Sequence, residues 1–345
     1  MQFNIICIIM VKNNKIRVAI NGFGRIGRAA FKIALDNKKI EIVAINDLTD
    51  ANILAHLLKY DTAYGKYAKK VQAGNNTIIV NNKKYPITAI KDPVKLPWKK
   101  LKVDVVLECT GIFRTEADLI KHIKAGAKKV LLSAPAKGGG VNTYVLGVNS
   151  DKYSSEKYIN NASCTTNCVA PVAQVISSAF GVKKAAMTTI HSYTADQRLQ
   201  DAPHNDLYRA RAAAQNIVPT TTGAAIATAS TIPELDGLFD GISVRVPTIV
   251  GSLSDITFVT KKRTSVEEVN NALIRASETP RLKNILKVTT EQLVSSDIIG
   301  ESASAIVDLN MTQVIDGDLV KVIAWYDNEW GYANRLVEMI NQVHK

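Results

Sequence analysis

Residues 16–47 constrain the fold more than any other part of this chain. They read IRVAINGFGRIGRAAFKIALDNKKIEIVAIND, and an apolar strand pattern runs directly into Gly22, Gly24 and Gly27. Apolar residues then recur at helical spacing, and a second apolar run covers residues 40–45. A strand, a glycine-rich turn, a helix and another strand make one βαβ unit. Such a unit predicts a parallel sheet, because its two strands run in the same direction.

The glycine spacing is typical of a dinucleotide-binding turn. The first glycine permits a tight turn, the second lets the backbone approach a pyrophosphate, and the third lets the helix pack close to the strand. The helix begins around Arg25 and Ile26, so its free N–H groups are expected to bind the pyrophosphate. Asp47 ends the second strand 20 residues after Gly27, where a carboxylate binds ribose hydroxyls and repels a 2′-phosphate. The pattern favours NAD over NADP, although Asp47 has an alternative role as the cap of the next helix.

The alternation of strands and helices continues through the first half of the chain. Two further strand patterns, with a helical pattern between them, predict an α/β fold with a Rossmann-type doubly wound parallel sheet. Thr110, Gly111 and Ser133 end these strands, at the edge where such sheets bind ligands. His122 falls within the helical pattern and is expected to pack or to face solvent. We expect residues 1–162 to form a NAD-binding domain.

Beyond residue 162 the pattern changes to one long helix followed by strands in succession. A hairpin pattern turns at the Asp-Gly dipeptide of residues 316–317. Strands without regular intervening helices predict a mainly antiparallel sheet backed by helices. We therefore expect an α+β catalytic domain over residues 163–330, and a closing helix at 331–345 that packs back on the first domain.

The catalytic candidate is Cys164, in the segment ASCTTNC of residues 162–168. A structural cysteine prefers apolar neighbours, whereas hydroxyl and amide side chains surround this one. It also opens a helix, where the helix dipole and free N–H groups favour a thiolate. His191 ends a strand within HSYT and is the best candidate for its base, although alone it fits a capping or core role equally well. Cys168 is expected to pack in the core, with capture of an oxidised Cys164 as the alternative.

Hydroxyls, a glycine and arginines near these two residues suggest anion binding. A guanidinium fork and a threonine hydroxyl together suit phosphate, because they can share its oxygens. One arginine alone is more often part of a surface ion pair, so the prediction depends on the whole set. The set comprises Ser163, Thr165, Thr194, Arg209, Thr222, Gly223 and Arg245.

Charge and cysteine content narrow the function classes. The net charge of +12 is uneven, because residues 1–160 carry 27 Lys and Arg against 12 Asp and Glu. This excess fits a solvated surface or the steering of anionic small molecules better than a nucleic-acid site. Four cysteines in 345 residues make no disulfide framework, and their spacing matches no metal site. We expect a cytoplasmic protein without a membrane span, whose residues 1–12 are an appendage rather than a targeting signal.

Ten segments, in this order, resemble the phosphorylating glyceraldehyde-3-phosphate dehydrogenases from about residue 16 to the end of the chain. They are INGFGRIGR, INDLTDANILAHLLKYD, ECTGIF, SAP, ASCTTNC, HSYTADQRL, RARAA, PTTTGAA, RVPT and YDNEWGY. The resemblance implies oxidation of glyceraldehyde 3-phosphate with NAD and inorganic phosphate, through a hemithioacetal and a thioester on Cys164. It also implies a homotetramer in which the 193–216 stretch lies close to a neighbouring subunit's cofactor.

The resemblance assigns further roles to individual residues. Thr194 and Arg245 would hold the phosphate of the substrate. Ser163, Thr165, Thr222, Gly223 and Arg209 would hold inorganic phosphate. Asn328 would orient the nicotinamide carboxamide, with Tyr332 of the same segment at the cofactor site.

Three alternatives stay open. Ala202 stands where NAD-specific members often carry leucine, which weakens the case against NADP, whereas Asp47 and Leu48 resemble the NAD-using form. The substrate could be another aldehyde, such as erythrose 4-phosphate or a semialdehyde. A nucleic-acid-binding role of the basic first half is the alternative outside enzymes.

Overall fold

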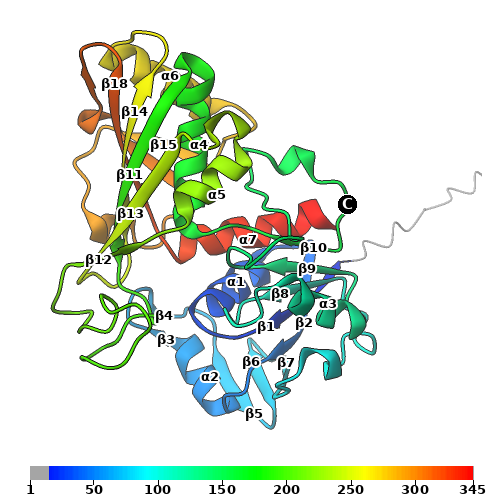
Figure 1. Cartoon of the computed structure of the whole chain (residues 1–345). Coiled ribbons are helices and arrows are strands. Elements are labelled where there is room, and N and C mark those ends of the chain that lie inside the picture. The colour runs from blue at the N-terminus through cyan, green and yellow to red at the C-terminus, as the bar shows by residue number, and fades with distance from the viewer. Residues whose placement is uncertain (1–14, 345) are drawn as a thin grey trace, which may run out of the picture.

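The computed structural model describes residues 15–344, so the predicted appendage at 1–12 lies outside the described residues. Two sheets form two lobes, and helix α7 (Trp330–Val343) runs between them (Figure 1). Each sheet has its own buried apolar cluster, which accounts for the two-part pattern of the sequence. The α/β fold class predicted from the sequence is confirmed.

The first sheet has eight strands in the order β10-β9-β8-β1-β2-β7-β6-β5. All neighbouring pairs from β10 along the sheet to β7 are parallel, whereas the pairs β7–β6 and β6–β5 are antiparallel. The sequence pattern did not predict this antiparallel edge, which short asparagine-containing turns with positive φ at Asn76, Asn81 and Asn82 produce. The strands are β1 (Ile16–Asn21), β2 (Ile40–Asn46), β5 (Val71–Gly74), β6 (Thr77–Val80), β7 (Lys83–Thr88), β8 (Val105–Glu108), β9 (Lys129–Leu132) and β10 (Tyr158–Asn160).

Helices cover both faces of this sheet. On β1, Val18 and Ile20 pack in the cluster that contains α1 (Arg25–Asp36) and α7, whereas Ala19 packs with Leu119 of α3 (Glu116–Lys124). Successive residues of a strand point to opposite faces, so this division shows that both faces are buried. The doubly wound arrangement follows from it. Helix α2 (Ala51–Lys59) and the short strands β3 (Tyr60–Asp61) and β4 (Gly65–Lys66) follow β2.

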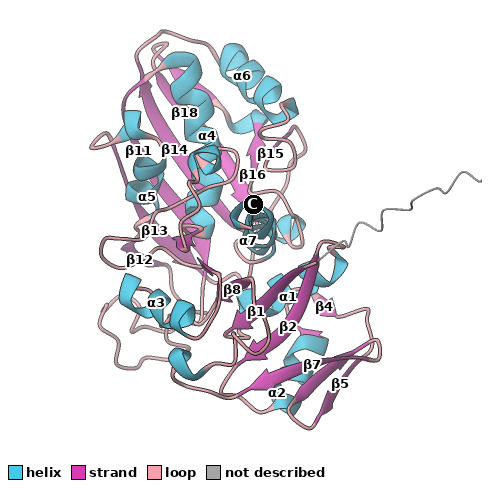
Figure 2. Ribbon diagram, turned by 90° about the vertical axis from the view of Figure 1, so that its right-hand side faces the viewer, coloured by secondary structure: helices cyan, strands magenta, loops and turns pink. Residues whose placement is uncertain are grey.

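The second sheet runs in the order β12-β13-β11-β14-β18-β16-β15, with β17 on β18. It is mainly antiparallel as predicted, but β11–β13 and β15–β16 are parallel pairs. Helices α4 (Cys164–Phe180), α5 (Ala224–Thr231) and α6 (Val266–Glu278) belong to this lobe (Figure 2). The strands are β11 (Val182–Ser192), β12 (Val218–Thr221), β13 (Phe239–Val246), β14 (Ser252–Thr260), β15 (Leu286–Thr289), β16 (Ala305–Asp308), β17 (Gln313–Ile315) and β18 (Leu319–Tyr326).

The predicted hairpin joins β17 and β18. Asp316 and Gly317 have φ of 46° and 71°, so both central residues of the turn are left-handed. Asp-Gly is favoured there because aspartate, asparagine and glycine tolerate positive φ. The hairpin positions β18, whose carboxyl end leads into residues 327–329 beside the first lobe.

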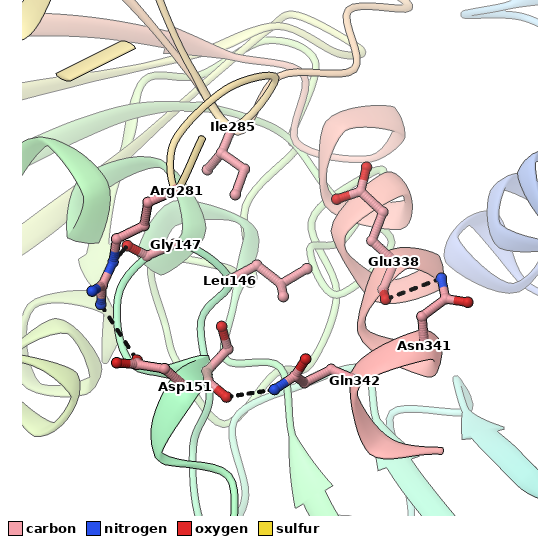
Figure 3. Close-up of a pocket in the computed structure, with 9 residues that line it drawn as sticks. Leu146, Gly147, Asp151, Arg281, Ile285, Glu338, Asn341 and Gln342 are labelled. Carbon is pink, nitrogen blue, oxygen red and sulfur yellow. Dashed lines mark hydrogen bonds and ion pairs between the residues drawn. The ribbon is translucent and has the colours of Figure 1, made fainter. Parts of the chain in front are cut away.

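Helix α7 also borders a pocket of about 350 Å³, where it meets the loop at 146–151 and the chain after α6 (Figure 3). Arg281 donates to the carbonyl of Gly147 at 2.7 Å, and Gln342 donates to the carbonyl of Ser150 at 2.9 Å. The first bond joins the chain after α6 to the 146–151 loop, and the second joins that loop to α7. None of the predicted site residues lines this pocket, so we interpret it as part of the junction between the lobes.

Candidate active site

Cys164 and His191 come together at the start of α4. The thiol sulfur lies 3.4 Å from His191 Nε2, although 27 residues separate the two in the chain. Cys164 is the first residue of α4, and the Ser163 hydroxyl caps the helix by accepting from the N–H of Thr166. His191 lies on β11 with 3% of its surface exposed. The sulfur therefore faces a buried imidazole in hydrogen-bonding range.

His191 has two competing neighbours on its other ring nitrogen. Nδ1 lies 2.7 Å from the carbonyl oxygen of Ser192 and 2.8 Å from Arg245 Nη1. A carbonyl only accepts and a guanidinium only donates, so one nitrogen cannot satisfy both at once. When Nδ1 donates to Ser192, Nε2 is left as an acceptor toward the thiol. Burial and the charge of Arg245 lower the pKa of His191 to about 3, so the ring is neutral and can act as a base.

The sequence-based expectation of a favoured thiolate at Cys164 is not supported. Burial raises the pKa of the thiol, and this outweighs the opposing effects of Arg245, the Thr165 hydroxyl and the N–H groups at the helix start. The expectation counted only the helix terminus and neglected desolvation by the surrounding fold. The raised pKa of the thiol and the lowered pKa of the imidazole both favour the neutral forms of this pair.

Tyr326 is a site residue that the sequence analysis missed. Its hydroxyl lies 2.9 Å from that of Thr165 and 2.8 Å from that of Thr189, and its ring meets the His191 ring edge to face at 6.0 Å. It is 1% exposed and ends β18. The alternating pattern of this strand marks Tyr326 as inward-facing, but only the fold places it under the thiol and imidazole.

The two arginines of the anion-binding set differ in their partners. Arg209 forms ion pairs with Asp196 and, at 3.3 Å, with Asp206, and donates to Thr220 at 3.0 Å. Arg245 has no carboxylate partner among the ion pairs of residues 15–344, and its Nε is buried without a hydrogen-bond partner. The positive charges of both arginines act on His191.

The other members of the set lie at helix starts or in the loop after β11. The Thr222 hydroxyl accepts from the N–H of Ala224 at 3.1 Å, and Gly223 is the residue before α5. Thr194 follows β11 by two residues, in the 193–216 stretch, and Thr165 is the second residue of α4. The Thr165 hydroxyl lies 4.0 Å from the Cys164 sulfur and is hydrogen-bonded to Tyr326, whereas the Ser163 hydroxyl lies 2.8 Å from that of Thr166. Among the hydrogen bonds of residues 15–344, none joins Arg209 or Thr222 to the thiol.

The first lobe carries a separate crevice of about 670 Å³ at the carboxyl ends of its parallel strands. Gly22 has φ of +92°, and a Cβ there would lie 2.6 Å from the backbone nitrogen of Thr110. A Cβ on Gly27 would lie 2.1 Å from the carbonyl oxygen of Gly22, so this glycine lets α1 approach β1. Gly24 has open space where a side chain would be, and no side chain caps α1. This geometry fits an anion held at the start of α1.

The predicted cofactor residues divide between lining and supporting positions. Gly22, Gly24, Asp47 and Thr110 line the crevice, and Asp47 accepts from the N–H of Phe23 at 2.7 Å. The other predicted residues of this lobe do not line the crevice. The guanidinium of Arg25 pairs with acids, Ile26 packs against the core, and Gly27 packs on Gly22. Gly111 is exposed with φ of +70°, and the N–H of Ser133 donates to the backbone carbonyl of Glu108 at 3.0 Å.

A buried polar network below the crevice was also missed. Glu108 accepts from Asn21 at 2.5 Å and from the N–H of Thr110 at 2.8 Å, and lies 3.0 Å from His122. Trp98 donates to His122 Nδ1 at 3.1 Å. Because an indole only donates, the other ring nitrogen of His122 carries the proton toward Glu108. Of the two alternatives expected for His122, packing is confirmed, because the side chain is buried against Trp98 and Phe113. It also orients the carboxylate that holds the crevice turn.

Asn328 and Tyr332 lie in and after the turn that leads from β18 into α7. The side-chain oxygen of Asn328 accepts from Ser252 at 2.9 Å and from the N–H of Gly251 at 3.2 Å, which orients its amide. Tyr332 donates to the carbonyl of Ala162, two residues before Cys164, at 3.1 Å. Within residues 15–344 no group of three or more His, Cys, Asp or Glu side chains could hold a metal ion, and no helix could cross a membrane.

Comparisons with known proteins place this geometry in a family. Residues 16–116 match the profile of the NAD-binding domain of glyceraldehyde 3-phosphate dehydrogenase, and residues 163–328 match that of its C-terminal domain. The glyceraldehyde-3-phosphate dehydrogenase of Geobacillus stearothermophilus is 52% identical over 326 residues, covering 94% of this chain and 97% of that protein. Glyceraldehyde-3-phosphate dehydrogenase 1 of Bacillus subtilis is 50% identical over 332 residues, covering 96% and 98%. The chain belongs to the glyceraldehyde-3-phosphate dehydrogenase family.

Proposed function

We propose that the protein oxidises D-glyceraldehyde 3-phosphate with NAD and inorganic phosphate, giving 1,3-bisphosphoglycerate. The observation that supports this most is the 3.4 Å distance between the Cys164 sulfur and His191 Nε2 at the start of a helix. Arg245, which has no carboxylate partner among residues 15–344, lies beside this pair. A nucleophile, a neutral base and a cation in this arrangement suit covalent chemistry on a phosphorylated aldehyde.

In the first step the Cys164 sulfur attacks the aldehyde carbon. His191 Nε2 takes the thiol proton and returns it to the carbonyl oxygen, so a neutral hemithioacetal forms and the imidazole is restored. The low pKa of His191 favours this return, because the imidazolium is a strong acid. A substrate phosphate on Arg245 would also draw the guanidinium from His191 Nδ1 and leave that nitrogen to donate to Ser192.

In the second step His191 accepts the hydroxyl proton of the hemithioacetal as the carbon loses hydride, which leaves a thioester on Cys164. NAD bound in the crevice supplies the hydride acceptor. Asn328 is suited to hold the carboxamide, because its oxygen is already occupied and its amide N–H groups are available for an acceptor. Asp47 holds the ribose hydroxyls, and the start of α1 holds the pyrophosphate.

In the last step an oxygen of inorganic phosphate attacks the thioester carbon. The carbon–sulfur bond breaks and the acyl phosphate leaves. The departing sulfur of Cys164 takes back the proton that His191 accepted in the second step, and the proton of the attacking phosphate passes to solvent. Thr194 and Arg245 hold the phosphate of the substrate, while Ser163, Thr165, Arg209, Thr222 and Gly223 hold the attacking phosphate. Arg209 must exchange at least one carboxylate partner for phosphate, because Asp196 and Asp206 already pair with it.

The proposal extends to organisation and location. Residues 1–162 serve as the NAD-binding domain and residues 163–330 as the catalytic domain, with four copies assembling into a homotetramer. The protein acts in the cytoplasm, where thiols stay reduced. NAD is the preferred cofactor, since the Asp47 carboxylate at the crevice would repel a 2′-phosphate.

Reduction of NAD by the purified protein tests the reaction. With glyceraldehyde 3-phosphate we expect sustained turnover only when inorganic phosphate is present, and one equivalent of NADH per site without it. Cys164→Ser should lower turnover by about 10⁴-fold or more, because no acyl-enzyme forms. Faster turnover with erythrose 4-phosphate would change the substrate, and turnover indifferent to phosphate would contradict the acyl-phosphate product.

A further inference from the structure

The side chain of Arg25 is directed to a cluster of acids instead of to the crevice. Its Nε donates to both carboxylate oxygens of Glu329, at 2.9 and 3.0 Å, and Nη2 also pairs with Glu329. Its Nη1 donates to Asp61 at 2.9 Å. The side chains of Asp61 and Glu329 are 6% and 15% exposed and that of Arg25 is 32% exposed, so both ion pairs are partly shielded from water. Shielding strengthens such pairs, because solvent and salt screen them less.

The two acids lie on different elements. Asp61 is on β3, in the same lobe as α1, whereas Glu329 precedes α7 and follows Asn328 directly. Arg25 is the first residue of α1, at the proposed pyrophosphate site. One guanidinium thus connects the pyrophosphate end of the cofactor site with the turn that carries Asn328, across 304 residues of chain.

This turn has several anchors besides Arg25. Asp327 accepts from the hydroxyl of Tyr64 at 2.8 Å and from the N–H groups of Glu329 and Trp330 at 2.9 and 2.7 Å. Tyr64 packs against Trp330 with ring centroids 5.5 Å apart, and Arg25 lies 5.7 Å over the Tyr64 ring. These contacts hold the ends of the turn, and the Glu329 carboxylate is the group that ties it to α1.

We propose that Glu329 is a positioning residue for cofactor binding, which sets Asn328 against the nicotinamide half through its ion pair with Arg25. The inference rests on the proposed role of Asn328. Asp61 holds Arg25 independently, so loss of the Glu329 charge leaves α1 and the pyrophosphate site in place. Glu329 should therefore affect binding of the nicotinamide half and not of the ADP-ribose half.

Binding of NAD and of ADP-ribose, measured by calorimetry on the full chain, tests this asymmetry. ADP-ribose keeps the adenosine, the pyrophosphate and the second ribose but lacks nicotinamide. For Glu329→Gln we expect the Kd of NAD to rise about tenfold and that of ADP-ribose to change less than about twofold. Asp61→Asn is the matched control, since it removes the other carboxylate partner of Arg25 and should leave the ratio of the two Kd values unchanged.

The proposal would be overturned if Glu329→Gln raised the Kd of NAD and that of ADP-ribose equally, or if it changed neither Kd. Asn328→Ala separates this failure from failure of the proposed function. If Asn328→Ala lowers the affinity for NAD alone and Glu329→Gln does not, only the role of Glu329 is wrong. If neither variant changes the ratio, the nicotinamide assignment fails, and the Glu329 proposal with it. Should Glu329→Gln not fold, Glu329→Asp carries the same test, because its shorter side chain lengthens the ion pair.

Discussion

At the scale of single residues, we expect the charge of Arg245 to affect the reactivity of Cys164. Burial raises the pKa of the thiol, and the nearby guanidinium lowers it. The rate of alkylation by iodoacetamide should therefore rise with pH from about 7 to about 9, because the thiolate is the reacting species. Arg245→Leu should shift this profile to higher pH and slow alkylation about threefold or more near pH 8. The measurement is the pH dependence of the labelling rate followed by mass spectrometry.

Other cysteines and the second arginine supply the controls for this profile. Among the cysteines that the structure describes, Cys164 should be labelled fastest, since burial raises the pKa of Cys109 to about 12 and also raises that of Cys168. Cys164→Ser should therefore lose the label on the peptide that carries position 164, and peptide mapping separates this label from any on Cys7, which lies outside the described residues. Arg209→Leu should shift the profile less than Arg245→Leu, because Asp196 and Asp206 already balance its charge. An unchanged or faster rate in Arg245→Leu would show that the guanidinium does not stabilise the thiolate.

At the scale of elements, α7 supports the backbone that precedes α4. Tyr332 of α7 donates to the carbonyl of Ala162, a residue with φ of 55° that lies two positions before Cys164. A non-glycine residue in this left-handed region needs support from its surroundings. Tyr332→Phe should lower the free energy of unfolding by about 1 kcal/mol, because it leaves a buried carbonyl without its donor. Urea denaturation checks the value.

Tyr67→Phe is the matched control for this element-scale prediction. Its hydroxyl is buried and has no hydrogen-bond partner among residues 15–344, so its removal breaks no bond that the structure describes. The ring contacts with Lys32 and Lys69 remain available to phenylalanine. We expect Tyr67→Phe to leave the unfolding free energy within about 0.5 kcal/mol of the wild type. Equal losses in both variants would mean that the Tyr332 hydrogen bond has no special value.

At the scale of the whole molecule, the proposed homotetramer accounts for apolar side chains that one chain leaves uncovered. Leu207 in the 193–216 stretch is 80% exposed, and Ile242 on β13 is 52% exposed. Exposed apolar side chains are typical of surfaces that associate when they gather in one patch. Light scattering should give a mass near four times that of the 37.6 kDa chain. The exposed apolar residues concerned are Leu199, Leu207, Tyr208, Ile217, Ile226 and Ile242.

A charge placed on this surface should separate the copies. Leu207→Asp should give a smaller mass than the wild type at equal concentration, because burying an unpaired carboxylate is unfavourable. Val266→Asp, at an exposed position that starts α6, should leave the mass unchanged. A monomeric wild type would contradict the assembly, and Leu207→Asp with unchanged mass would exclude this residue from the interface.

The sequence by itself determined the local conformations and the residue types of the site. The glycine turn at 22–27, the start of α4 at Cys164 and the Asp316–Gly317 hairpin depend on backbone preferences within a few residues, so a short stretch of chain suffices to predict them. The two-part architecture followed from hydrophobic periodicity. The antiparallel edge of the first sheet was not predicted, because the short strands β5 and β6 carry little pattern.

Only the tertiary structure decided which of these groups meet and how they are charged. His191 touches Cys164 across 27 residues, Tyr332 reaches Ala162 across 170, and Arg25 pairs with Glu329 across 304. Such contacts depend on the packing of whole elements, which spacing along the chain does not encode. The same holds for the thiol of Cys164: the helix start favours the anion, but burial opposes it and raises the pKa of the thiol. Desolvation is a property of the complete fold, and for this reason the chemistry of the site could not be derived from its local sequence alone.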